Sequence, residues 1–148
     1  MTIAVLAALL AGTLIAIQSA IIGVFGENLN PFVAAVWVHV GGLAFGVLGV
    51  LVAPRLGFEL AAVRQAPWGL LAGVAGMLLV TGIAVAVGGL GLASTLAIVT
   101  GMQLVVGFAL EATGLIGRAV ALDPVRVVGA LLIVAGVYVV ASRGPVPA

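Results

Sequence analysis

Five polar side chains within long apolar stretches are the residues of this sequence most able to do chemistry. They are Gln18, His39, Thr100, Gln103 and Glu111. Polar and ionisable groups are costly at membrane depth, so each is by default a functional hypothesis. We expect these five to line a cavity for a substrate or a proton.

Two of these side chains can titrate. A carboxyl group that is removed from water favours its neutral form, so Glu111 could take up and release a proton. It could instead be a solvated interfacial residue near Arg118. His39 could titrate near neutral pH, or it could be a neutral hydrogen-bonding residue. A single histidine with no nearby carboxylate is a poor metal site, so we expect no metal.

Several polar and small residues share one face of the helix predicted over residues 92–112, provided that this helix continues to residue 114. At 100° per residue they fall within an arc of about 80°. Such a stripe is typical either of a cavity wall or of hydrogen bonds that join helices. The residues of the stripe are Thr100, Gln103, Gly107, Glu111 and Gly114.

The elements that position these side chains are long apolar runs. Of the 148 residues, 65% are hydrophobic and 6% are charged, whereas soluble domains carry roughly 25% charged residues. A spanning helix needs about 20 mostly apolar residues. The sequence therefore predicts an all-α integral membrane protein, a bundle of five transmembrane helices in one domain over residues 1–148. The predicted helices cover residues 3–25, 32–53, 67–87, 92–112 and 124–142.

The breaks between the runs are short and polar or rich in glycine. In an alternative with four spans, residues 88–91 are buried and the segments on either side form a broken, partly re-entrant pair. Asp123 is a plausible N-cap for the last helix. No basic residue precedes Ile3, which favours a retained first helix over a cleaved signal peptide.

Twenty-two glycines give several helices a face of small residues. In lipid, helices associate through close backbone approach at such residues. We therefore expect helix packing at a set of small positions. They are Gly12, Ser19, Gly23, Gly42, Gly46 and Gly107.

Other classes of function find no support in the composition. The chain has no cysteine, which excludes disulfides and thiolate chemistry. Five scattered arginines do not form the basic patch that nucleic acid binding requires. The sequence has no Ser/His/Asp spacing typical of a hydrolase, no HExxH zinc motif and no glycine-rich phosphate-binding motif. We therefore expect neither an enzyme nor a cofactor.

Short motifs follow one another in a characteristic order. The first group is Gln18-Ser19-Ala20-Ile21-Ile22, Asn30-Pro31-Phe32, Ala35 and Gly42. The second is Gly101-Met102-Gln103-Leu104, Glu111, Gly114-Leu115-Ile116-Gly117, Arg126-Val127-Val128-Gly129 and Ala135-Gly136-Val137. Together they resemble the YdcZ-like family, a five-helix branch of the drug/metabolite transporter (DMT) superfamily. The chain departs from the family at Ile22 (usually Asn), His39 (usually Phe) and Glu111 (usually Asp).

The resemblance implies a half-size transporter that works as a pair of oppositely oriented subunits. Our leading hypothesis is a small-molecule exporter subunit in the bacterial cytoplasmic (inner) membrane, driven by a proton gradient through alternating access. The alternative is a membrane assembly or accessory subunit that does not transport, with glycine faces that bind a larger partner.

The arginines predict a fixed orientation. Arg55, Arg64, Arg118 and Arg126 fall on the N-terminal side of a five-span chain, and only Arg143 falls on the other. Because this bias sets orientation, we expect the N-terminus in the cytoplasm and the C-terminus outside. An oppositely oriented partner should then be a homologous chain with the opposite bias.

Overall fold

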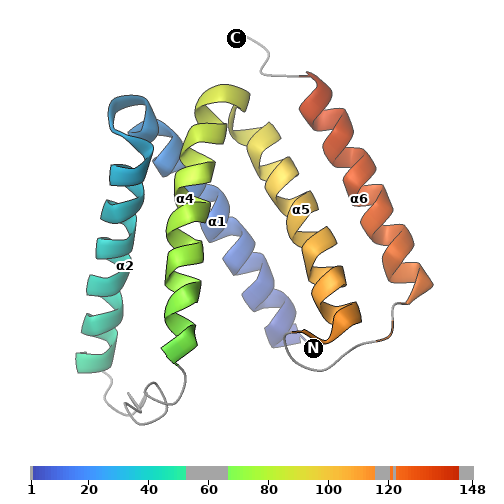
Figure 1. Cartoon of the computed structure of the whole chain (residues 1–148), viewed down its shortest axis with the longest axis horizontal. Helices are drawn as coiled ribbons and strands as arrows, with labels where there is room; N and C mark the ends of the chain where they lie inside the picture. Colours follow the sequence, from blue (N-terminus) through green and yellow to red (C-terminus); the bar gives the residue numbers. More distant parts are fainter. Residues whose placement is uncertain (1, 53–66, 116–120, 122, 144–148) are drawn as a thin grey trace. The chain divides into compact units, whose positions relative to one another are not determined.

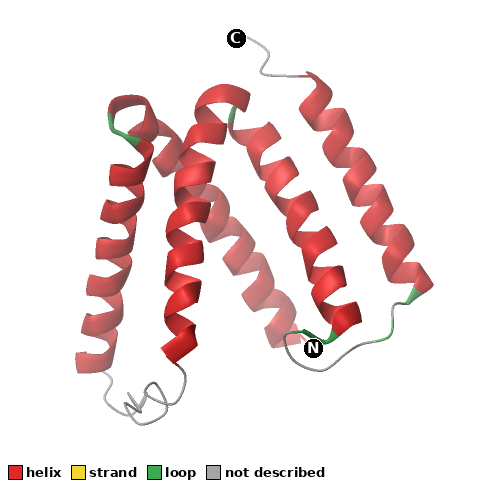
Figure 2. Cartoon of the chain, viewed as in Figure 1, coloured by secondary structure: helices red, strands yellow, loops and turns green. Residues whose placement is uncertain are grey.

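The computed structural model describes residues 2–52, 67–115, 121 and 123–143. Within these residues, five helices are long and apolar enough to cross a membrane. They are α1 (Thr2–Asn28), α2 (Pro31–Val52), α4 (Leu70–Leu90), α5 (Leu92–Thr113) and α6 (Pro124–Arg143), with a 3-10 turn, η2 (Pro67–Gly69), before α4 (Figures 1 and 2). The prediction of an all-α membrane protein with five spans is confirmed. Since α4 and α5 are each of spanning length, the four-span alternative is not supported.

The exposed surface of the helices is largely apolar. Large hydrophobic side chains such as Leu9, Phe45, Leu71 and Leu132 are each more than 60% exposed. In water such a surface would be strongly unfavourable, whereas lipid solvates it without cost. The outward faces therefore fit a bilayer.

The chain forms two compact units, Met1–Gly88 and Gly89–Ala148. The core of the first unit joins three helices through Ile22 of α1, Ala35 of α2, and Val80 and Ala84 of α4. At Gly23 an added Cβ atom would overlap the Val87 side chain, and at Gly26 it would lie 3.4 Å from the Cβ atom of Ala84. Glycine at these positions lets α1 approach α4 closely.

The hairpin between α1 and α2 is tighter than the sequence predicts. Helix α1 continues to Asn28, so that the break contains only Leu29 and Asn30. The Asn30 side-chain oxygen accepts a hydrogen bond from the backbone N–H of Phe32 at 2.9 Å. Asn30 is thus the N-cap of α2, with Pro31 in the favoured first helical position.

In the second unit, two glycines with positive φ delimit α5. Gly91 (φ 76°) precedes the helix, and Gly114 (φ 64°) ends it while donating a hydrogen bond to the carbonyl of Leu110 at 3.0 Å. Glycine adopts this left-handed backbone without the strain of a Cβ atom. Helix α6 begins where predicted, since the Asp123 carboxylate accepts a hydrogen bond from the N–H of Val125 at 3.1 Å. The N-cap role of Asp123 is confirmed.

Helices α5 and α6 pack against each other around a second glycine contact. A Cβ atom added to Gly101 would lie 3.1 Å from a methyl group of Val137. This contact holds α6 against one side of α5. The polar residues of α5 lie on a neighbouring face.

Candidate functional site

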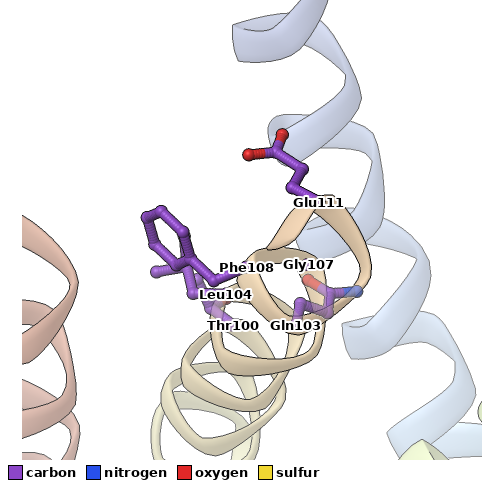
Figure 3. A pocket seen from close by; sticks show the side chains of 6 residues that line it. All are labelled: Thr100, Gln103, Leu104, Gly107, Phe108 and Glu111. Carbon is purple, nitrogen blue, oxygen red and sulfur yellow. The ribbon is translucent and has the colours of Figure 1, made fainter. Parts of the chain in front are cut away.

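A groove of about 340 Å³ runs along α5. Because α5 continues to Thr113, Glu111 lies within its last turn and on the same helix as Thr100, Gln103 and Gly107. The helix does not reach residue 114 as the predicted stripe required, since Gly114 ends it in a left-handed conformation. All of the lining residues that the structure describes come from this one helix (Figure 3). They are Thr100, Gln103, Leu104, Gly107, Phe108 and Glu111.

The lining residues form two neighbouring rows along the helix. Thr100, Leu104 and Phe108 are spaced four apart, and so are Gln103, Gly107 and Glu111. Rows with this spacing are the ridges of a helix surface. Figure 3 shows Gln103 and Phe108 on opposite sides, with the Glu111 carboxylate between them. The groove thus has a mainly polar side and a mainly apolar side.

Gly107, the middle residue of the polar row, leaves a space in it. No atom of the described chain lies within 4 Å of the point where its Cβ atom would stand. The missing side chain leaves room between Gln103 and Glu111. The sequence placed Gly107 both in the polar stripe and among the helix-packing residues. It lines the groove, and its packing role stays a prediction.

The polar side chains of the groove differ from three threonine side chains elsewhere in the helices. Thr13, Thr81 and Thr113 each donate a hydrogen bond to the carbonyl oxygen four residues earlier, at 2.8–2.9 Å. Across the described ranges, no comparable bond is made by Thr100, and none by the side chains of Gln103 or Glu111. Lipid cannot satisfy such groups. Partners for these side chains therefore have to come from beyond the contacts that the described residues make, and water or a ligand would serve.

Phe108 and Leu104 are lining residues that the sequence did not single out. Phe108 also borders a smaller apolar pocket against α6, together with Val105, Val127, Ala130, Leu131 and Val134. It therefore stands where the polar groove meets the α5–α6 contact. Phe108 is neither polar nor small, so the pattern of polar and small residues does not include it. Its spacing of four from Leu104 and eight from Thr100 nevertheless places it on this face.

Gln18 and His39 belong to the first unit, on α1 and α2. Gln18 is exposed, while His39 is half-buried and takes part in helix packing. The His39 Nδ1 atom lies 2.8 Å from the carbonyl oxygen of Ala35, so this nitrogen carries the donated proton. Its Nε2 atom faces α4, at 3.0 Å from where a Cβ atom of Gly76 would be. A role in helix contact explains the position of His39 without a cavity.

We expect Gly76→Ala to destabilise the first unit. The added methyl group would press on the His39 ring, and overpacking of this kind costs about 1–3 kcal/mol. Gly73→Ala, on the same helix, is the matched control, because nothing lies within 4 Å of its Cβ position. Thermal unfolding in detergent, followed by circular dichroism, should separate the two variants. Equal stability would show that the His39 contact with α4 is loose.

The other small positions divide into two groups. Ser19 is buried, and its hydroxyl donates to the Ile15 carbonyl at 2.7 Å. Gly23 contacts Val87. In contrast, Gly12, Gly42 and Gly46 have no atom of the described chain within 4 Å of the Cβ position. Gly42 and Gly46 line an apolar groove of about 480 Å³ on α2.

A further hollow of about 470 Å³ lies at the hairpin between α1 and α2. Its lining is Phe25, Leu29, Ala34, Trp37 and Val38. A ligand site needs a few placed polar groups to orient its ligand, and these side chains have none apart from the indole N–H of Trp37. The groove on α5 is therefore the better candidate.

The family comparison agrees with the fold. Residues 3–139 match the family model DMT_YdcZ, which is described as "Putative inner membrane exporter, YdcZ". The chain belongs to this YdcZ family. No curated protein and no solved structure gave a match. The match to the YdcZ family covers all five spans almost completely and makes the chain a multi-pass inner membrane protein of the exporter class.

Proposed function

We propose that this chain is one half of a proton-coupled exporter of small molecules. Its transport cavity would be completed by a second five-helix subunit inserted in the opposite orientation. The observation that carries the proposal is the α5 groove, where polar side chains without hydrogen bonds among the described residues line a space on an otherwise apolar helix. The proposed activity is transport, with no covalent chemistry and no cofactor.

The lining of the groove supports the proposal of a second subunit. A substrate that crosses a membrane by alternating access is held near the midplane and enclosed by protein. The lining residues that the structure describes all come from α5, so α5 provides one wall. The groove on α2 and the open positions at Gly12, Gly42 and Gly46 support the same idea, because small residues allow another helix to approach.

The proposed proton carrier is Glu111. A carboxylate that is reached from one side of the membrane at a time can bind a proton on one side and release it on the other. Thr100 and Gln103 lie on the same face and offer a hydroxyl and an amide to a substrate. The position of Glu111 in the last turn of α5 would place it toward one end of the cavity.

We expect Glu111→Gln to abolish transport driven by a pH gradient. Glutamine keeps the size and hydrogen bonding of the side chain but cannot ionise. The measurement is efflux of a panel of small molecules from vesicles that contain the purified protein and its partner chain, between pH 6 and 8. Glu111→Asp, which keeps the charge, is the control and should keep part of the activity. If Glu111→Gln transported as well as the native chain, Glu111 would not carry the proton and would be only an interfacial residue.

The orientation of the chain determines which partner it needs. Four arginines against one predict a single orientation, with the C-terminus outside. Because the sequence has no cysteine, a single cysteine at Val146 reports this directly. An impermeant thiol reagent added outside intact cells should label nearly every molecule. Labelling of about half the molecules would instead show that the chain inserts in both orientations. The partner could then be a second copy of this chain, in an antiparallel homodimer.

The apolar groove on α2 also favours a second candidate function. A subunit that only assembles with a larger membrane protein would use open glycine faces such as Gly42 and Gly46. In that case, the polar residues of α5 would be buried in a protein contact and hidden from water. Access of water to the α5 groove therefore separates the two functions.

A further inference from the structure

We propose that the α5 groove selects organic cations, with Glu111 as the counter-charge and Phe108 as an aromatic wall. This inference rests on the proposed function, because it names the substrate class of the same site. It concerns which molecules bind, whereas the proton coupling above concerns how binding is driven. The two can therefore fail separately.

The charge of the groove favours a positive ligand. Among the residues that the structure describes, its lining contains one acidic side chain, Glu111, and no basic one. On α6, which packs against α5, the charged side chain that the structure describes is Arg126, and it does not line the groove. A carboxylate beside apolar side chains attracts a cation and repels carboxylates and phosphates.

The shape of the groove favours a cation that also has an apolar part. Leu104 and Phe108 form the apolar side, and a hydrocarbon group can pack there. In Figure 3 the Glu111 carboxylate turns toward the side of the helix on which the Phe108 ring lies. A positive group held near the face of an aromatic ring gains additional attraction.

The polar side of the groove fits the same ligand class. The side-chain oxygens of Gln103 and Thr100 can accept hydrogen bonds from an ammonium group. Neither side chain has another partner among the residues that the structure describes. Gly107 keeps the space between Gln103 and Glu111 open, so that the positive group can reach the carboxylate.

The test uses three probes that have similar size and differ in charge. They are benzyltrimethylammonium, its uncharged carbon isostere neopentylbenzene, and the anion benzenesulfonate. Binding to the full-length chain in lipid nanodiscs, together with its partner chain, is measured by equilibrium dialysis at one fixed pH. Empty nanodiscs give the background for partition into lipid. We expect saturable binding of the cation alone.

Variants of the lining residues test whether the cation binds in the α5 groove. Glu111→Gln should weaken binding of the cation by roughly tenfold or more, because it removes the counter-charge, and Glu111→Asp should restore part of it. Phe108→Leu should weaken binding about two- to fivefold, the range expected for a cation–π contact. Met102→Leu, an exposed position on another face of α5, is the control and should bind as the native chain does.

The proposal is overturned if Glu111→Gln binds the cation as tightly as the native chain, or if the uncharged or anionic probe binds equally well. If cations do not bind while Glu111-dependent transport of other molecules persists, the substrate class is wrong and the exporter function stands. If cations bind while Glu111→Gln transports normally, the proton role is wrong and the substrate class stands.

Discussion

Replacing Gly107 by leucine is expected to stop transport while leaving the protein folded. No atom of the described chain lies within 4 Å of its Cβ position, so a leucine side chain has room to form and disturbs no described helix contact. It would fill the space between Gln103 and Glu111. An obstruction that costs even about 1.4 kcal/mol lowers binding roughly tenfold, and we expect at least this loss in vesicle efflux.

The control for this prediction is Gly136→Leu on α6. Nothing in the described chain lies within 4 Å of that Cβ position either, but Gly136 does not line the groove. Both variants should keep native helix content by circular dichroism. If Gly107→Leu transports as well as Gly136→Leu, the groove on α5 is not the path of the substrate.

The second large effect is expected from Gly23→Ala, on stability. The added Cβ atom would overlap one methyl group of Val87 and lie 3.3 Å from the Val87 Cβ atom. Rotation of the valine side chain cannot move its own Cβ atom, and valine in a helix has one strongly preferred rotamer. Helices α1 and α4 would have to separate, which costs about 1–3 kcal/mol.

Two further variants make this stability prediction specific. Gly12→Ala, on the same helix, has open space at the Cβ position and should be neutral or stabilising by up to about 1 kcal/mol. The double variant Gly23→Ala with Val87→Ala should recover part of the loss, since it removes the overlapping methyl group but keeps the Val87 Cβ position at 3.3 Å. Denaturant unfolding in detergent would contradict the close α1–α4 approach if Gly23→Ala matched Gly12→Ala.

The sequence predicts the five helices well because hydrophobicity over about 20 residues is a strong signal. It places the break after α1 too early, at Gly26, because glycine and polar residues normally indicate a turn. In the structure, helix α1 continues through Gly26 and Glu27 to Asn28, and the Asn30 cap determines where α2 begins. Contacts between helices decide such boundaries, and a single sequence does not contain them.

The candidate site is predicted only in part, because the sequence shows which residues share a face of one helix but not which residues meet between helices. Thr100, Gln103 and Glu111 were found because helical geometry fixes which residues of one helix share a face. His39 lies against Gly76 on α4, a contact that no regular spacing reveals, and its place in a cavity stays a prediction. Phe108 was missed because an aromatic residue in an apolar helix does not stand out by composition. Its role depends on its place beside Glu111.

The access of water to the α5 groove tests the central claim most directly. Thr100 lies eight residues into α5, about 12 Å from its start at 1.5 Å per residue, and so deep in the membrane. In a chain without native cysteine, Thr100→Cys would report on the groove. Met102→Cys would report on another exposed face of the same helix at nearly the same depth. A thiol reacts as its thiolate, which forms in water and not in lipid.

The measurement is the rate at which a small impermeant thiol reagent labels each variant in membrane vesicles that contain the partner chain. The account predicts that Thr100→Cys is labelled much faster than Met102→Cys, and that excess benzyltrimethylammonium slows the labelling of Thr100→Cys alone. Equally slow labelling of both variants would contradict it. The groove would then be a dry protein or lipid contact, and the chain would be an assembly subunit rather than half of an exporter.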